Sequence, residues 1–522
     1  MPATWYLTSV VARKTSPRTR STVNTLDLAR WQFAIVTVYH FIFVPLTIGL
    51  APLVAIMQTC WVVTRKDRWL KLTKFFGKLF LINFALGVVT GIVQEFQFGM
   101  TWSAYSRFVG DVFGAPLAME GLAAFFVEST FLGLWIFGWD RLPKKIHLAT
   151  IWLVAVSVNL SAFFILAANS WMQHPVGTIL NTETGRAEMV DIKAILTNNT
   201  LWAAFPHTVT SAFVTAGTFV VGISAWWMVR LLRRGDAADA AVARDVYRPG
   251  VRLGAIFLIV AGLGVVLTGD FQAKLMFQQQ PMKMASAEAL CETETGASFS
   301  ILSLGDLNND CEGVTRVLAV PNLTSFLADS SFDSQIKGVE ELQQEYAQKY
   351  GYTDASGEPI SYVPNLALTY WSFRLMIGFG VFSAAVGVLA LWLTRKGRVT
   401  SSRWFSRLAI VSIPAPFLAC AFGWIFTETG RQPWVVVPNP TGVDGVWLLT
   451  QRGVSPIAPG LVLTSMIAFT VVYGVLALVW YRLIHRYTVE GAPESVTDVS
   501  PSTLGGRPAG QDEDDAPLSF AY

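Results

Sequence analysis

Three residues at the end of an apolar stretch have the types and spacing to hold a charged group inside a membrane. They are Trp424, Glu428 and Arg431, and the hydrophobic run that they close begins near Leu408. On a helix, their i, i+4 and i+7 spacing would place them on one face. A charge at bilayer depth costs about 2.5–3.5 kcal/mol, so such residues usually serve a site. The alternative is a helix end whose charges extend into the headgroup region, and partners on other helices would decide against it.

Other apolar stretches do carry side chains that could act with this group. They are His40, Glu95, Glu120, Glu128, His207, Arg374 and Met376. Histidine and methionine both bind haem iron axially, and a His/Met pair raises its reduction potential. The sequence has no paired CxxC motif, phosphate loop or dinucleotide fingerprint, which disfavours zinc, iron–sulfur and nucleotide sites. Spacing alone does not establish a haem site, because the candidate ligands come from different helices.

The composition indicates an all-α polytopic membrane protein. Of 522 residues, 52% are hydrophobic and 14% are charged, against about 25% charged in soluble domains. About nine apolar segments are long enough to span a bilayer. They lie near 31–63, 73–99, 113–138, 147–172, 205–232, 251–277, 366–394, 406–429 and 460–485.

The distribution of basic residues predicts the orientation of these spans. Lysine and arginine cluster after the first, third, fifth, seventh and ninth spans, which places the N-terminus outside and the C-terminus in the cytoplasm. Nearly all the polar residues named above then fall in the outer half of the bilayer. Glu128 is the exception, because an α-helix would place it about 12 Å deeper than Glu120 and rotated by about 80°.

The remaining segments complete the predicted organisation. Residues 1–30 form an N-terminal tail, 31–278 the first six spans, 279–365 a polar extracytoplasmic loop, 366–486 the last three spans, and 487–522 a disordered cytoplasmic tail. Cys291 and Cys311 both fall in the outer loop, an oxidising location that permits a disulfide. Closing that loop of about 20 residues would stabilise the fold by roughly 3 kcal/mol; the alternative is two unpaired thiols.

Several long motifs resemble subunit I of the cytochrome bd quinol oxidases. They are LARWQFA at 28–34 leading to His40, FVPLT at 43–47, GKLF at 77–80, NFALG at 83–87, EFQFG at 95–99, FGAPL at 113–117, ANSWMQ at 168–173 and GRQPW at 430–434. The resemblance extends from the first span to the eighth. It implies a nine-helix subunit with two haems b and one haem d, which oxidises quinol and reduces dioxygen to water.

The resemblance also suggests roles for individual residues. His207 and Met376 match the axial pair of the low-spin haem, and His40 and Glu428 match the proximal ligands of the two high-spin haems. The resemblance leaves open which of these two residues holds haem d. Glu95, Glu120, Trp424, Arg374 and Arg431 are the residues expected near the haems. Arg374 lies about 200° from Met376 on a helix, so we expect it to meet a propionate or a neighbouring helix.

The segment KMASAE at 283–288 matches the family's quinol-oxidising segment, with Lys283 and Glu288 as the residues carried over. Quinol oxidation releases two protons, and a carboxylate can accept one. Glu128 is the candidate for relaying protons from the cytoplasm to the site where water forms. Because these protons would cross from the cytoplasm, the enzyme would contribute to the proton motive force without pumping.

The resemblance further implies that the protein lies in the lipid of the bacterial plasma membrane. It implies a second large subunit and small single-helix subunits as partners, ubiquinol or menaquinol as substrate, and no binding of nucleic acid. Two alternatives remain. One is a variant of the same oxidase with haem b in place of haem d, and the other is a proton-coupled transporter.

Overall fold

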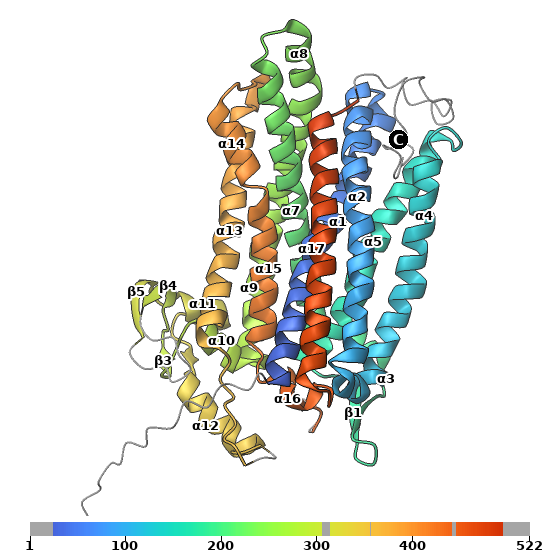
Figure 1. The fold of residues 1–522 in the computed structure, drawn as a ribbon. Coiled ribbons are helices and arrows are strands. Elements are labelled where there is room, and N and C mark those ends of the chain that lie inside the picture. Colours follow the sequence, from blue (N-terminus) through green and yellow to red (C-terminus); the bar gives the residue numbers. More distant parts are fainter. Residues whose placement is uncertain (1–23, 305–313, 355–356, 441–444, 494–522) are drawn as a thin grey trace, which may run out of the picture.

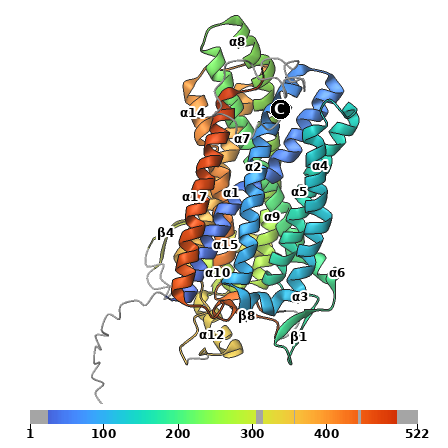
Figure 2. The same cartoon turned by 45° about the vertical axis from the view of Figure 1, so that its right-hand side comes forward.

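The computed structural model describes residues 24–304, 314–354, 357–440 and 445–493, and these are largely helical. Long helices run side by side in one bundle (Figures 1 and 2). Within the described ranges, nine helical segments are long and apolar enough to cross a membrane. This confirms the predicted all-helical protein with nine spans, whereas its orientation in the membrane stays a prediction.

Helices are expected here because lipid offers no partners to backbone N–H and C=O groups. The spans are formed by α1 (Thr25–Thr64), α2 (Asp67–Met100), α3 (Ser103–Met119) with the π-helix η1 (Glu120–Phe125) and α4 (Phe126–Phe137), α5 (Lys144–Gln173), α6 (Ile192–Leu196) with α7 (Asn199–Leu232), α8 (Ala237–Val242) with the π-helix η2 (Ala243–Tyr247) and α9 (Arg248–Gln279), α13 (Leu366–Leu393), α14 (Arg403–Val411) with α15 (Pro414–Thr429), and α17 (Pro459–Glu490).

Short elements lie outside the spans. The helices are α10 (Pro281–Ala287), α11 (Leu323–Asp329), α12 (Val339–Tyr350), the 3-10 turn η3 (Arg395–Gly397) and α16 (Thr450–Gly453). In the described part of the chain, the strands form four antiparallel pairs: β1 (Thr178–Asn181) with β2 (Arg186–Met189), β3 (Glu294–Thr295) with β6 (Gln335–Ile336), β4 (Phe299–Leu304) with β5 (Thr315–Val320), and β7 (Trp434–Val436) with β8 (Leu448–Leu449).

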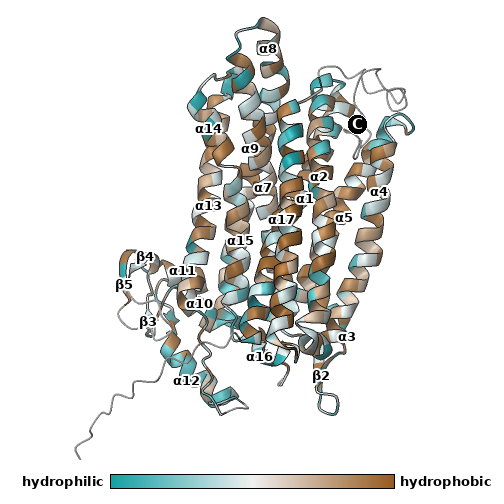
Figure 3. Ribbon diagram, viewed as in Figure 1, coloured by the Kyte–Doolittle hydropathy of each residue, from teal (hydrophilic) through white to brown (hydrophobic). Residues whose placement is uncertain are grey.

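The bundle has a buried centre and apolar outer faces suited to contact with lipid. In the most apolar window of each span, 89% of the residues are buried in the α6–α7 span but only 11% in α17. Hydrophobic residues cover the spans and hydrophilic ones gather at the ends (Figure 3). The polar loop with α10, α11, α12 and β3–β6 lies at one end of the bundle, and α8 and α14 lie at the opposite end (Figure 1).

Several helices extend beyond their predicted ends, and two of them enter the predicted tails. α1 begins at Thr25 because the Asn24 side chain accepts a hydrogen bond from the Leu26 N–H, which caps the helix, and Asp27 suits its first turn. α17 continues to Glu490, into the segment predicted as a tail. Residues 1–23 and 494–522, which make up most of both predicted tails, lie outside the described residues.

The predicted helical face of Trp424, Glu428 and Arg431 is wrong for Arg431. α15 ends at Thr429 with Gly430 as its C-cap. Proline, which lacks an N–H and disfavours helix in the residue before it, follows at 433. Arg431 therefore lies in the turn after the helix.

The predicted rotation between Glu120 and Glu128 is also wrong, because the π-helix η1 begins at Glu120 and ends before Glu128. A π-helical turn takes up one extra residue, which turns the chain beyond it back by about 100°. The rotation of about 80° expected for a continuous α-helix thereby becomes about 20°. Both carboxylates consequently fall on nearly the same face.

Candidate functional site

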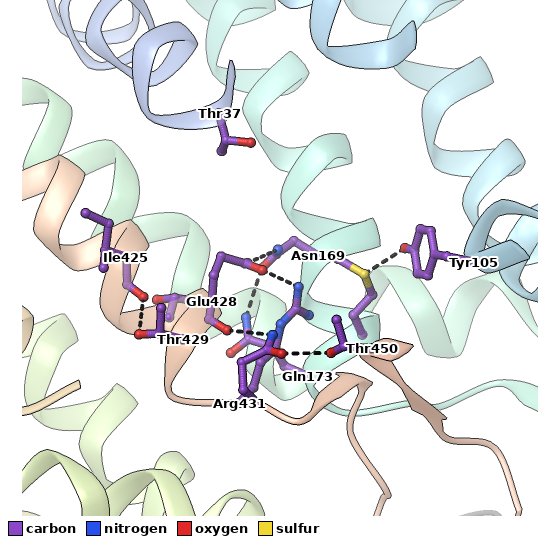
Figure 4. Close-up of polar contacts among 12 residues, drawn as sticks. Thr37, Tyr105, Asn169, Gln173, Ile425, Glu428, Thr429, Arg431 and Thr450 are labelled. Atoms are coloured by element: carbon purple, nitrogen blue, oxygen red, sulfur yellow. Dashed lines mark hydrogen bonds and ion pairs between the residues drawn. The ribbon is translucent and has the colours of Figure 1, made fainter. Parts of the chain in front are cut away.

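Glu428 lies on the last turn of α15 between two hydrogen-bond donors (Figure 4). Its Oε1 accepts a hydrogen bond of 3.1 Å from Asn169 Nδ2 on α5, and its Oε2 forms an ion pair with Arg431. Asn169 Oδ1 in turn accepts a hydrogen bond of 2.9 Å from Gln173 Nε2. The sequence prediction that Glu428 and Arg431 act together is consistent with this ion pair.

The Arg431 guanidinium has N–H donors that its ion pair with Glu428 does not use. The residue is only 5% exposed, and its Nε and Nη1 atoms have no hydrogen-bond partner in the described part of the chain. Arginine stays charged at any physiological pH, and a buried donor without a partner costs about 1–3 kcal/mol or more. A carboxylate of a bound group would satisfy both atoms. The expected haem propionate therefore fits this position.

His40 is held by a threonine of the neighbouring helix. Its Nδ1 lies 2.9 Å from Thr90 Oγ1 on α2. The Thr90 hydroxyl donates its only proton to the carbonyl of Leu86 or Gly87, one turn earlier. Thr90 must then accept at its oxygen, which assigns the proton of His40 to Nδ1. Nε2 keeps its lone pair and is available to a metal.

His207 is held in the same way on another pair of helices. Its Nδ1 lies 3.0 Å from Thr268 Oγ1 on α9, and that hydroxyl donates to the carbonyl of Gly264 at 2.7 Å. In both places a glycine follows the threonine and lies against the imidazole: a Cβ at Gly91 would be 3.2 Å from His40 Cε1, and a Cβ at Gly269 would be 3.3 Å from His207 Cε1. Both histidines thus rest on a Thr-Gly pair.

α15 lies between the helices that carry Met376 and His40. The Met376 sulfur would be 2.9 Å from a Cβ at Gly423. The next residue, Trp424, stacks on Phe41 with 5.3 Å between ring centroids, and Phe41 follows His40 in the chain. The Trp424 Nε1 is buried and has no partner among the described residues. Trp424 thus lies between the surroundings of the two predicted ligands.

The three predicted carboxylates of α2, η1 and α4 lie near one another. The Glu120 carboxylate accepts a hydrogen bond of 2.7 Å from Ser161 Oγ on α5. It interacts electrostatically with Glu95 and with the buried Glu128. The structure therefore brings these three residues together.

Arg374 contacts the polar loop, a partner other than the propionate or neighbouring helix expected from the sequence. Its Nη2 lies 2.8 Å from Glu288 Oε2 in a pair whose side chains are 8% and 3% exposed. The guanidinium also donates to the carbonyls of Ala287 and Ser300, and it lies 3.8 Å from the centroid of the Tyr370 ring. The pair fastens the end of α10 to α13.

Lys283 and Glu288, the predicted quinol-contacting residues, are both buried. Lys283 Nζ lies 3.4 Å from the carbonyl of Thr427 and 5.1 Å from the centroid of the Phe426 ring. Burial, together with the nearby Arg431 guanidinium, lowers the pKa of Lys283 to about 7. Burial raises the pKa of Glu288, although Arg374 opposes the rise. Both groups can therefore exchange protons nearer neutral pH than usual.

Of the two cysteines in the predicted disulfide, only Cys291 lies among the described residues. Cys291 is disulfide-bonded, whereas Cys311 lies outside the described residues, so the Cys291–Cys311 pairing stays a prediction. Cys60 and Cys420 are free thiols.

Sequence reasoning missed Thr90, Thr268 and the role of Asn169. A weak signal for the threonines exists, since both close similar runs: GVVTG at 87–91 and GVVLTG at 264–269. Within the part of the chain that the structure describes, no three His, Cys, Asp or Glu side chains group to hold a bare metal ion. Haem iron needs only one or two protein ligands, which suits histidines that stand apart.

The chain matches known proteins over nearly all its length. Residues 28–492 match the family model of cytochrome bd terminal oxidase subunit I. The cytochrome bd ubiquinol oxidase subunit 1 of Bacillus subtilis (strain 168) is 46% identical over 90% of this chain and 95% of its own. The cytochrome bd-II ubiquinol oxidase subunit 1 of Escherichia coli (strain K12) is 36% identical over 92% of this chain and 100% of its own.

A solved structure shares the fold. The bd oxidase from Geobacillus thermodenitrificans superposes with a TM-score of 0.76 at 25% identity, covering 90% of this chain and 99% of that one. Together with the sequence matches, this excludes the transporter alternative. The chain belongs to the family of cytochrome bd terminal oxidase subunit I, and it is an oxidoreductase of the quinol oxidase class.

Proposed function

We propose that this subunit oxidises quinol at the outer membrane face and contributes to the reduction of dioxygen to water with two haems b and one haem d. The observation that carries the proposal is the matched state of His40 and His207. Each histidine has its Nδ1 proton engaged by a threonine, which leaves Nε2 as a metal ligand. If the two histidines only packed the bundle, there would be no reason for both to have the same threonine bond at Nδ1.

The chain's residues divide among the bound groups as follows. His207 and Met376 would hold the low-spin haem b, and His40 and Glu428 would hold the two high-spin haems. Arg431 would neutralise propionates with its free donors. When bound, the haems supply one-electron transfer and a place for dioxygen. The protein's own task is to orient the ligands and to move protons.

Quinol oxidation needs a group that takes up a proton where quinol binds. Each quinol releases two electrons and two protons, and two quinols balance one dioxygen reduced to two waters. Glu288 supports this role because burial raises its pKa, which makes the carboxylate a stronger base. Lys283, with a pKa of about 7, is the second group on this segment that can exchange a proton. Protons released here would leave on the outer side.

The protons consumed in forming water would enter from the cytoplasm. Glu128 supports such a path because it is buried and interacts with Glu120, which η1 brings onto nearly the same face. A Glu128→Ala variant should slow oxygen reduction by about 100-fold, the usual size of a positioned acid–base group.

The Glu128 test combines two measurements on the same preparation. Stopped-flow reduction of the low-spin haem by quinol should keep its wild-type rate, while steady oxygen consumption falls. Unchanged oxygen consumption would remove Glu128 from the proton path, and equal loss of both rates would indicate a folding defect.

The test of the proposed function is an absorption spectrum of the reduced, purified oxidase with extraction of its haems. Bands of haem b with the long-wavelength band of a chlorin support the proposal. Haem b bands without the chlorin feature favour the haem-b-only variant, and the absence of haem bands would overturn the assignment of His40, His207, Met376 and Glu428 as ligands.

The threonines give a separate prediction. Thr90→Val should weaken retention of the haem at His40, and Thr268→Val that of the haem at His207, each by about 10–100-fold, as for other outer-shell partners. Without the Nδ1–H···O bond the imidazole donates less charge, so the midpoint potential of the affected haem should rise. Haem content and spectroelectrochemical titration measure both effects.

Serine variants at the same positions keep the hydroxyl and should restore wild-type values. Thr464→Val serves as the matched control, because Thr464 makes the same bond to a carbonyl one turn earlier, on exposed α17, and contacts no histidine. A potential that stays the same in Thr90→Val and Thr268→Val would show that the threonines merely pack.

The proposal includes a second large subunit and small single-helix subunits, since the relatives are named subunit 1. The apolar windows of α17 and of α3–α4 are only 11% and 17% buried in this chain. Partner helices and lipid would cover these faces in a bacterial plasma membrane.

A further inference from the structure

A groove between α7 and α14 lies at the end of the bundle opposite the polar loop (Figure 1). Its volume is about 380 Å³. It is lined by Trp226, Val229, Arg230, Arg233, Arg403, Ser406, Arg407, Ile410 and Val411. Four of these nine residues are arginines, and there is no acidic residue among them, so the groove is complementary to an anion.

The arginines of the groove differ from others at the same end of the bundle. Arg248 and Arg252 donate to the carbonyl of Thr394, and Arg234 pairs with Asp239. Those arginines have structural partners. By contrast, the guanidinium groups of Arg233, Arg403 and Arg407 form no ion pair or hydrogen bond with the described residues.

Arg230 is ordered by aromatic rings instead. Its guanidinium lies 5.0 Å from the Trp226 ring and 4.9 Å from the Trp227 ring. Such stacking holds the group in place while leaving its N–H donors directed elsewhere.

The groove is amphiphilic along the helix axes. On α7, which ends at this side, Arg230 and the C-cap residue Arg233 come after Trp226 and Val229. On α14, which begins at this side, Arg403 and Arg407 come before Ile410 and Val411. On both helices the charges therefore lie at the outer end and the apolar side chains about one turn, or about 5 Å, deeper.

We propose that this groove binds an anionic phospholipid, with its phosphate among the arginines and its acyl chains along Ile410 and Val411. The exposed Val411 and the apolar depth distinguish a lipid from free phosphate, which would need no apolar wall. Basic pockets between membrane helices on the cytoplasmic side bind anionic headgroups in this way. The site is independent of the haem assignments.

The test compares lipid retention in the purified oxidase complex by native mass spectrometry. After delipidation, the complex is titrated with phosphatidylglycerol, with phosphatidylcholine and with inorganic phosphate. The test variant is Arg403→Gln/Arg407→Gln. The control, Arg482→Gln/Arg486→Gln, removes the same charge from exposed positions of α17 outside the groove.

The wild-type complex and the control should retain phosphatidylglycerol, and the Arg403→Gln/Arg407→Gln variant should bind it at least tenfold more weakly while keeping the wild-type absorption spectrum and elution volume. Equal binding of phosphatidylcholine, equal loss in both variants, or phosphate displacing the lipid would overturn the proposal. If the test variant fails to assemble, Arg403→Lys/Arg407→Lys keeps the charge and is expected to bind the lipid; failure to do so would also overturn it.

Discussion

A His207→Ala variant is expected to lose the low-spin haem and with it quinol-driven reduction of the remaining haems. Even an outer-shell partner of a metal ligand is worth about 10–100-fold in affinity, so removal of the ligand itself should cost more. Haem b extracted per protein should fall towards half, since one of two haems b is lost. Oxygen consumption with quinol should fall more than about 100-fold.

His485→Ala is the matched control, because His485 is exposed on α17 and, among the described residues, stacks only on Tyr481. It should keep both haem content and activity. Added imidazole should partly restore the low-spin spectrum of His207→Ala by filling the space left by the side chain. A His207→Ala protein with a wild-type low-spin spectrum would exclude His207 as a ligand.

An Arg374→Gln variant is expected to loosen the quinol segment and to lose activity with quinol. Glu288 would then be a buried carboxylate without its cation, and breaking a buried pair in this way costs about 3–5 kcal/mol. The carbonyls of Ala287 and Ser300 would lose their donor as well. Hydrogen exchange over residues 281–304 should rise by two orders of magnitude or more, and the thermal midpoint of the complex should fall.

Two further variants separate the pair from general loop damage. Arg316→Gln breaks the Arg316–Glu294 ion pair of the same loop, whose side chains are 20% and 39% exposed, and should cost less than about 1 kcal/mol. Arg374→Met/Glu288→Met removes both charges, so it should be more stable than Arg374→Gln while remaining inactive with quinol. Equal small effects of Arg374→Gln and Arg316→Gln would show that the buried pair does not anchor the segment.

An artificial electron donor that bypasses quinol gives the last readout. With it, Arg374→Gln should retain oxygen consumption, because the residues proposed to hold the haems are not altered. Loss of that activity would place Arg374 at a haem rather than at the quinol segment.

The nine spans were predictable from the sequence because transfer from water to lipid depends mainly on the composition of about 20 consecutive residues. The predicted ends were less accurate. α1 starts early at the cap formed by Asn24, and α17 continues to Glu490. Both effects involve only a few neighbouring atoms, which an average over a window does not resolve.

The types of the site residues were also visible in the sequence, because histidine, glutamate and arginine are costly in an apolar span and therefore conspicuous. Only the tertiary structure decided which of them meet. The Thr90–His40 and Thr268–His207 bonds, the Arg374–Glu288 pair and the Asn169–Glu428 bond each join separate segments of the chain. Hydropathy and periodicity describe a segment by itself, whereas these contacts depend on how helices pack and, at η1, on one π-helical turn that rotates Glu128 towards the face of Glu120. Sequence by itself therefore determined the spans and the chemistry available to this oxidase subunit, and packing between helices determined the geometry in which that chemistry is held.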